Sequence, residues 1–366
     1  MRVTAGNAAA YGIYSQTGAI AVRLYGPELP DHELIVRRIA EALSLRDEAF
    51  GTTAGARPAA DSDAYRLVNG EGDRLPGLVI DRYGRYAVIK RYASGLDDVI
   101  GLGAKEVGVR LKLRGVVERV SSGREARNGE AVAPPTLQPL WGEAPPPQLT
   151  IRENGLRFEI DPWHGQKSGA FLDQRENRAL VREHSNGRRV LNLFAYHGGF
   201  SVYALAGGAE HVTSVDIAAP AVAAIAPNLA LNDLPAERHD SQAIDVFEAL
   251  PRWAADDAAA RYDLVIVDPP SLANNAEQRR RAQRAYFRLN RDAFKLVTPG
   301  GLLASASCTA QVSSESFKQT LAEAAAAAGV SAQIIAERGH ALDHPVPLAF
   351  PEGRYLKFVL LRVLPL

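Results

Sequence analysis

The chain has very little cysteine and no long apolar run. One cysteine in 366 residues cannot form an internal disulfide, and the first residues lack the apolar core of a secretory signal. We therefore expect a cytoplasmic protein. No stretch approaches the roughly 18 uninterrupted apolar residues of a membrane span, so no membrane partner is expected. The formal net charge is zero, from 42 basic and 42 acidic residues, so any nucleic-acid contact must come from a local basic patch.

What the sequence does have is a change of pattern along the chain. Residues 1–26 predict two short strands, and residues 27–154 predict a connecting helix followed by a small α+β domain. Prolines are concentrated in residues 128–150, which predicts a linker or an edge ribbon near a domain boundary. From residue 155 to residue 366, short apolar runs alternate with helical stretches. This is the pattern of an α/β domain with a doubly wound, mostly parallel sheet.

The first two predicted strands of this last part are followed by residues suited to a nucleoside. After the first strand, Gly198 and its neighbouring glycine allow a sharp turn that approaches a ligand. Asp216 ends the second strand, where a carboxylate accepts the ribose hydroxyls of an adenosine-containing cofactor. A structural glycine turn and a helix N-cap are equally good explanations of either element alone. Their combination favours a nucleoside cofactor.

Two further carboxylates follow the third and fourth predicted strands. Asp245 is a candidate for the adenine amino group, with helix N-capping as an equal alternative. Asp268 begins an Asp-Pro-Pro motif, in which the two prolines fix extended backbone just beyond the strand. Class I S-adenosylmethionine-dependent methyltransferases carry Asn/Asp-Pro-Pro at this place, and the chain resembles them here. The expected cofactor therefore becomes S-adenosylmethionine rather than NAD.

The single cysteine, Cys308, follows the next apolar run in the sequence Ser-Ala-Ser-Cys-Thr. Carbon 5 of a pyrimidine attacks a sulfonium methyl group only after a nucleophile has added to carbon 6, and a thiolate suits that task. A carboxyl group at Asp268 could steady the ring at N3 and its exocyclic group. Most lone cysteines are small buried hydrophobes, but the position one strand away from Asp-Pro-Pro favours a nucleophile.

Taken together, the chain resembles the PUA-domain-containing family of methyltransferases that make 5-methylcytosine in 23S ribosomal RNA of the large subunit. The matching segments are residues 65–82, 165–178, 192–200, 343–345 and 351–357, besides Asp-Pro-Pro and Ser-Cys. The resemblance implies a Rossmann-like class I methyltransferase domain, RNA as the partner, no metal, and a homodimer as one possible assembly. It also implies that residues 1–26 are a truncated PUA-like β remnant, because the family begins with a complete PUA domain.

The resemblance assigns catalysis to Cys308 as the nucleophile and to Asp268 beside base and cofactor. It implies a cofactor site that includes Lys167, Phe171, Gln174, Arg175, Phe194, Tyr196, Gly198, Asp216, Ile217, Asp245 and Asp268. Arg175 could pair with the cofactor carboxylate. A surface ion-pair network that includes Arg175 and Arg178 is the alternative. The sequence does not identify the base that removes the carbon 5 proton. His344 is one candidate, and a structural role as a helix cap or core residue is the alternative for it.

An arginine-rich helix is predicted over residues 277–296. Its basic residues at helical spacing are Arg280, Arg284, Arg288 and Arg291, with Tyr286 and Phe287 interleaved. Such a face could hold RNA phosphates at the lip of the pocket, or it could simply be solvated. Two other functions stay open at this point: a guanine methyltransferase of the same RNA, whose members lack the cysteine, and a non-catalytic methyltransferase-fold protein that binds or assembles RNA.

Overall fold

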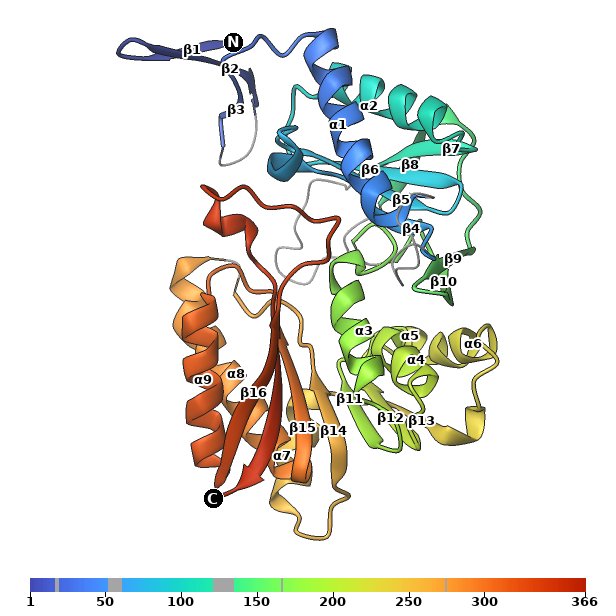
Figure 1. Ribbon diagram of the computed structural model, residues 1–366, viewed down its shortest axis with the longest axis vertical. Coiled ribbons are helices and arrows are strands. Elements are labelled where there is room, and N and C mark those ends of the chain that lie inside the picture. The colour runs from blue at the N-terminus through green and yellow to red at the C-terminus, as the bar shows by residue number, and fades with distance from the viewer. Residues whose placement is uncertain (17–19, 52–60, 121–134, 166, 274) are drawn as a thin grey trace. The chain divides into compact units, whose positions relative to one another are not determined.

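The computed structural model describes residues 1–16, 20–51, 61–120, 135–165, 167–273 and 275–366 (Figure 1). These residues form two compact units. Unit 1 contains Met1–Asp173 and Leu342–Ala349, and unit 2 contains Gln174–Ala341 and Phe350–Leu366. Among the residues described, no helix combines the length and the apolar character that a membrane crossing requires.

Unit 1 contains two sheets, a hairpin and two long helices. An antiparallel sheet joins β1 (Arg2–Ala5), β2 (Ala8–Tyr14) and β3 (Val22–Gly26). The second sheet has the order β4-β5-β6-β7-β8. Its strands are β4 (Ala64–Asn69), β5 (Leu78–Tyr83), β6 (Tyr86–Arg91), β7 (Gly115–Val120) and β8 (Thr136–Gly142). The sequence predicted two strands in residues 1–26; β1, a four-residue strand, was missed. The PUA-like identity of this region stays a prediction.

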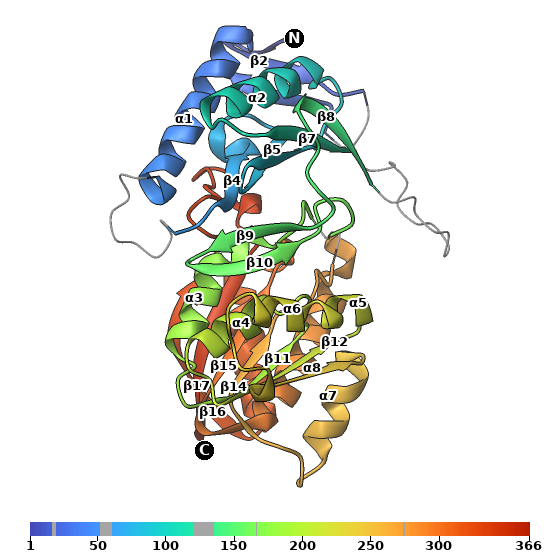
Figure 2. The same ribbon diagram turned by 90° about the vertical axis from the view of Figure 1, so that its right-hand side faces the viewer.

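The helices α1 (His32–Phe50) and α2 (Asp97–Arg110) cover one face of the five-stranded sheet (Figure 2). Asp31 begins α1 as an N-cap, because its carboxylate accepts a hydrogen bond from the Leu34 N–H at 2.9 Å. The apolar face of α1, including Ile35 and Ile39, packs with the sheet residues Leu67 and Ile80 in one core. This confirms the helix predicted in the connecting region.

The hairpin of β9 (Leu149–Glu153) and β10 (Leu156–Ile160) belongs to unit 1. The Asp63 N–H donates to the Arg152 carbonyl at 3.0 Å, and the Gly155 N–H donates to the Asp61 carbonyl at 2.9 Å. Because of these bonds, the compact units divide at residue 173 rather than at residue 155. The predicted ranges 1–26, 27–154 and 155–366 remain predictions about domains. Of the predicted proline-rich segment, residues 128–134 lie outside the described residues.

Unit 2 is built on a seven-stranded sheet of order β13-β12-β11-β14-β15-β17-β16. The strands are β11 (Arg189–Leu193), β12 (His211–Asp216), β13 (His239–Ala243), β14 (Tyr262–Val267), β15 (Val297–Ser307), β16 (Val330–Arg338) and β17 (Lys357–Pro365). Neighbouring strands are parallel except β17, which is antiparallel to both β15 and β16. The register pairs Ile334 of β16 with Leu361 of β17, so β17 lies inside the sheet and β16 forms its edge.

Helices cover both faces of this sheet, as the predicted doubly wound fold requires (Figures 1 and 2). One face carries α7 (Val246–Ala255), α8 (Arg279–Leu296) and α9 (Ser314–Ala327), whose apolar residues share a core with the strands. The other carries α3 (Arg175–Glu183), α4 (Gly199–Ala206), α5 (Ala219–Ala223) and α6 (Ile225–Ala230). The chain runs outward from β11 to β12 and β13, then returns to β14 on the opposite side. This reversal creates a switch point at the carboxyl edge, where α/β sheets bind ligands.

Candidate active site

The turn after β11 has an unusual backbone. Phe194, Tyr196 and Gly198 all have positive φ, at 61°, 49° and 81°. A side chain at position 198 would place its Cβ 2.8 Å from Cγ2 of Ile225, so glycine is required for space as well as for conformation. The predicted glycine turn is therefore present, and it begins α4 directly beyond the carboxyl end of the first strand.

Asp216 ties this turn to the next one along the edge. Its Oδ2 accepts a hydrogen bond from the Tyr196 N–H at 2.8 Å, and its Oδ1 accepts one from the Ala218 N–H at 2.9 Å. Each carboxylate oxygen has two acceptor positions, so both retain one for a ligand. A ribose diol fits this arrangement, because it would offer one hydroxyl to each oxygen.

His197 lies in the same turn and is held neutral. Burial, together with the charge of Arg178, lowers the pKa of its imidazole to about 4. A neutral ring leaves the turn without an added positive charge at physiological pH.

Asp245 caps α7, as the structural alternative anticipated. Its Oδ1 accepts a hydrogen bond from the Phe247 N–H at 2.8 Å, which leaves Oδ2 without a partner in the described part of the chain. Near it at the sheet edge, Phe194 and Phe247 meet edge to face, with ring centroids 5.4 Å apart. Ile217 is 68% exposed and Phe247 is 42% exposed. Exposed apolar side chains beside an available carboxylate oxygen fit an adenine ring and its amino group. The sequence prediction missed Phe247.

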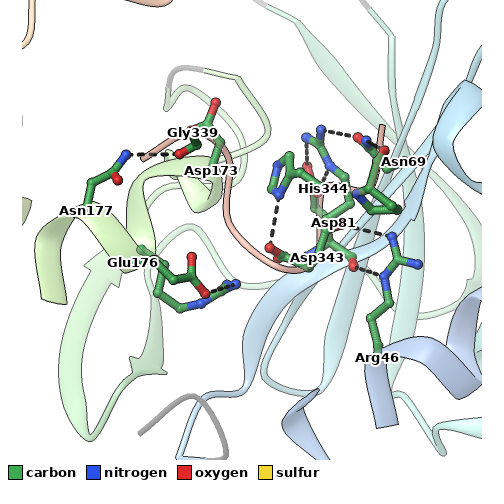
Figure 3. Close-up of polar contacts among 12 residues, drawn as sticks. Arg46, Asn69, Asp81, Asp173, Glu176, Asn177, Gly339, Asp343 and His344 are labelled. Atoms are coloured by element: carbon green, nitrogen blue, oxygen red, sulfur yellow. Dashed lines mark hydrogen bonds and ion pairs between the residues drawn. The ribbon is translucent and has the colours of Figure 1, made fainter. Parts of the chain in front are cut away.

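Asp268 is held by a hydrogen-bonded chain from α3. The Gln174 amide donates to Asp268 Oδ2 at 3.0 Å, and the Asn177 amide donates to Gln174 Oε1 at 2.6 Å. Asn177 is fully buried and also donates to the Gly339 carbonyl at 3.2 Å, which Figure 3 shows. The sequence prediction placed Gln174 at this site but missed Asn177, which lies one turn further along the helix.

Arg175 begins α3 and is completely buried, with its guanidinium 3.2 Å from Glu176 Oε1. Arg178 is also buried, and its guanidinium lies over the ring of Tyr203 at 5.9 Å. These positions exclude a surface ion-pair network for the two arginines. The predicted pairing of Arg175 with a cofactor carboxylate stays a prediction.

Cys308 lies beside the Asp-Pro-Pro motif. Its Sγ is 3.9 Å from the carbonyl oxygen of Pro269, and the residue is half-buried. Cys308 follows β15, the Asp-Pro-Pro motif follows β14, and these neighbouring strands run parallel. The structure therefore places the thiol beside the Asp-Pro-Pro motif, at the ends of neighbouring strands.

The turn that carries Cys308 is anchored from α8. The hydroxyls of Tyr286 and Thr309 are 2.8 Å apart, and Thr309 Oγ1 accepts a hydrogen bond from the Leu272 N–H at 3.0 Å. Tyr286 is fully buried, and burial raises its pKa to about 12. The sequence analysis grouped Tyr286 with an RNA-binding face. That grouping is wrong, because the residue lies on the buried face of α8 with Ala282 and Leu289.

The exposed face of α8 is basic. Arg280, Arg284 and Arg288 are all exposed, as their helical spacing predicts. Arg291 differs from them: it is half-buried, and its guanidinium pairs with both carboxylate oxygens of Asp292 at 2.7 and 3.1 Å. The available positive charge is therefore concentrated in the first half of the helix.

Three of the residues considered for the site belong to unit 1. Lys167 pairs with Asp173, with Nζ 2.6 Å from Oδ2, and its ammonium lies 4.5 Å from the ring centroid of Phe171. The cofactor roles of Lys167 and Phe171 stay predictions. His344 is buried, with Nδ1 3.0 Å from Oδ1 of Asp343 (Figure 3). This enclosed pair favours the structural role for His344.

The chain is similar to a known protein family, to curated relatives and to solved structures. Residues 134–338 match a family model described as S-adenosylmethionine-dependent methyltransferase. A ribosomal RNA large subunit methyltransferase of Deinococcus radiodurans is 39% identical, covering 97% of this chain and 86% of the relative. Ribosomal RNA large subunit methyltransferase I of Erwinia tasmaniensis is 35% identical, covering 96% and 86%. A crystal structure described as a methyltransferase complexed with SAH has the same fold, with a TM-score of 0.80, 24% identity, and coverage of 97% and 87%.

Proposed function

Since the chain belongs to the family of S-adenosylmethionine-dependent methyltransferases, we propose that it methylates carbon 5 of a cytosine in large-subunit ribosomal RNA. The RNA class is supported by the names of the relatives from Deinococcus radiodurans and Erwinia tasmaniensis. The position on the base is supported by one observation, the 3.9 Å approach of Cys308 Sγ to Pro269 beside Asp268. A homodimer and a cytoplasmic location remain predictions of the sequence.

S-adenosylmethionine supplies an electrophilic methyl group. Asp216 would accept the ribose hydroxyls, and Asp245 Oδ2 would accept the adenine amino group between the apolar side chains Ile217 and Phe247. These roles use acceptor positions that the fold leaves open in the described residues. Gln174, the N-cap residue of α3, and Arg175, its first residue, would line the methionine end. Cofactor roles for Lys167 and Phe171 stay predictions of the sequence.

The chemistry begins at Cys308. Its thiolate adds to carbon 6 of the cytosine, and the π electrons of the 5,6 double bond move toward carbon 5. Asp268 steadies the ring by a hydrogen bond at N3 or the exocyclic amine. Carbon 5 would then take the methyl group, whose bond to the sulfonium breaks with the electron pair left on that sulfur, and would give its proton to water or a base. The electrons of that C–H bond restore the double bond, the C–S bond breaks, and the thiolate is released.

The half-buried position of Cys308 suits this role. Because Cys308 is neither fully buried nor fully exposed, a flipped base could reach its thiol. The exposed arginines Arg280, Arg284 and Arg288 follow Asp-Pro-Pro in the chain, and we assign them to the phosphates of the RNA. Methylation of a guanine needs no cysteine nucleophile, so the position of Cys308 favours the cytosine reaction over the guanine methyltransferase.

The test uses RNA in which cytidine is replaced by 5-fluorocytidine. Fluorine cannot leave carbon 5 as a cation, so the adduct to Cys308 accumulates and shifts the protein on a denaturing gel. We expect the adduct with the wild type, its loss in Cys308→Ala, and a strong reduction in Asp268→Asn. Unsubstituted RNA is the matched control.

Two outcomes would select the other functions. Methylation of a guanine that persists in Cys308→Ala would establish the guanine methyltransferase. S-adenosylmethionine binding by calorimetry without transfer to any large-subunit RNA would establish the non-catalytic protein.

A further inference from the structure

A buried lysine lies next to the nucleophile. Lys357 is 5% exposed and begins β17, where the register pairs it with Ser307, the residue before Cys308. Its ammonium donates to the Thr309 carbonyl at 2.7 Å and to the Tyr355 carbonyl at 2.8 Å. The lysine is therefore hydrogen-bonded to the residue that follows Cys308, a contact that the proposed mechanism does not use.

The charge of Lys357 is not neutralised where it lies. In the described part of the chain, its hydrogen-bond acceptors are the two backbone carbonyls, which carry no net charge. A lysine buried without a carboxylate is costly unless its charge has another use. Two of its three N–H groups are occupied by the carbonyls, so one remains.

The ammonium and the thiol influence each other. Burial lowers the pKa of Lys357 to about 8, and the negative charge of the Cys308 thiolate opposes that change. Electrostatic coupling is reciprocal, so an ammonium that the thiolate stabilises must stabilise the thiolate equally. The positive charge therefore lowers the pKa of the thiol.

Asp268 and Tyr286 of unit 2 also lie close to this position and act differently. The carboxyl group of Asp268, when ionised, disfavours a second negative charge beside it. Tyr286 lies close to both Cys308 and Asp268, and its raised pKa keeps it neutral at physiological pH. Of these three groups, Lys357 is the one that favours the thiolate.

We propose that Lys357 is a positioning residue for methyl transfer, whose buried ammonium maintains Cys308 as a thiolate and, through the Thr309 carbonyl, fixes the turn that presents the sulfur. The use of that thiolate rests on the proposed function. The state of the thiol does not, and it can be measured without RNA or cofactor.

The single cysteine makes the measurement direct, because Cys308 is the one thiol that iodoacetamide can alkylate, and mass spectrometry of the peptide that contains it reports its reaction. The rate is followed from pH 5.5 to pH 10 with the full chain. We expect a wild-type midpoint below the ordinary thiol value of about 8.5. Lys357→Gln keeps N–H donors but removes the charge. We expect it to raise the midpoint by about one pH unit, so that alkylation below both midpoints is roughly tenfold slower.

Two further variants separate charge from packing. Lys357→Arg keeps the charge, and its midpoint is expected close to that of the wild type. Lys318→Gln removes a surface lysine that pairs with Glu337 and is expected to leave the midpoint unchanged. An equal midpoint in the wild type and in folded Lys357→Gln would overturn the inference. A wild-type midpoint at or above about 8.5 would overturn it without any variant.

The inference and the proposed function fail separately. A midpoint that depends on Lys357, with no 5-fluorocytidine adduct, would retain the ion pair and remove the cytosine chemistry. An adduct with a midpoint independent of Lys357 would do the reverse.

Discussion

The two units each bury a cation, and they hold it in opposite ways. In unit 1, Arg46 is 2% exposed and forms two parallel hydrogen bonds of 2.7 Å to the carboxylate of Asp73. In unit 2, the hydrogen-bond acceptors of Lys357 among the described residues are two neutral backbone carbonyls. The charge of Arg46 is cancelled at its own position and serves the fold, whereas the charge of Lys357 still acts on its surroundings. For this pair of residues, we therefore expect Arg46 to serve stability and Lys357 to act on the thiol of Cys308.

The strongest test of this contrast is Arg46→Met. It leaves the Asp73 carboxylate, which is 4% exposed, buried without its cation, so we expect the free energy of unfolding to fall by about 3–5 kcal/mol. Urea denaturation followed by circular dichroism measures it. Arg37→Met removes an exposed pair with Glu28 and should change stability by less than about 1 kcal/mol. A loss in Lys357→Gln as large as in Arg46→Met would erase the contrast.

A smaller effect is expected from pH, because the turn of unit 2 depends on a neutral His197. Its folded pKa of about 4 lies below the ordinary value of 6.5. The unfolded chain therefore binds more protons between these values, and the stabilisation is complete above pH 6.5 and lost as the pH falls toward 4. We expect a loss of about 1–3 kcal/mol over this range. Denaturation at four pH values measures it, with His197→Asn flattening the slope and His32→Asn as the exposed control. A slope unchanged in His197→Asn would refute the assignment.

Asn177→Ala probes the neutral hydrogen bonds that hold Asp268. The substitution leaves Gln174 Oε1 and the Gly339 carbonyl without a donor, so we expect a cost of about 1–2 kcal/mol in unfolding free energy. Gln174 would also lose its orientation toward Asp268, and kcat/KM should fall more than tenfold while the protein stays folded. Normal kcat/KM in a destabilised Asn177→Ala would limit this residue to a structural role.

The smallest effect on stability is expected at the exposed face of α8. Arg284→Gln should change the unfolding free energy by less than about 0.5 kcal/mol. If this arginine contacts a phosphate, RNA affinity should fall, and the slope of log affinity against log salt should become shallower by about 0.7 to 0.9. Filter binding at several salt concentrations measures both. An unchanged slope would remove Arg284 from the RNA interface.

The sequence predicted the residues that follow buried strands. Asp216, Asp268 and Cys308 each come directly at the end of an apolar run, and parallel strands bring such positions to one edge whatever the details of packing. This rule predicted that Cys308 and the Asp-Pro-Pro motif would follow neighbouring strands. The N-cap role of Asp245 was also among the alternatives.

Register and helix orientation explain what was missed. The position of Lys357 opposite Ser307 depends on the antiparallel register of β17, which no local pattern specifies. Tyr286 was misplaced although the apolar spacing of Ala282, Tyr286 and Leu289 contained the answer. Asn177 gave no signal, because a buried polar residue on a short helix has the same sequence pattern as a solvated one.

The position of residues 342–349 in the chain determines when unit 1 can finish folding during synthesis. They lie between β16 and β17 in the chain, yet belong to unit 1, where the Asp343 and Pro345 carbonyls accept hydrogen bonds from Arg46 and Asn69 at 2.9 and 2.8 Å (Figure 3). A ribosome begins unit 1 first, but its last segment emerges only after six of the seven strands of the other unit have been translated. Neither unit can be transplanted by a single gene fusion, because the polypeptide passes between them three times.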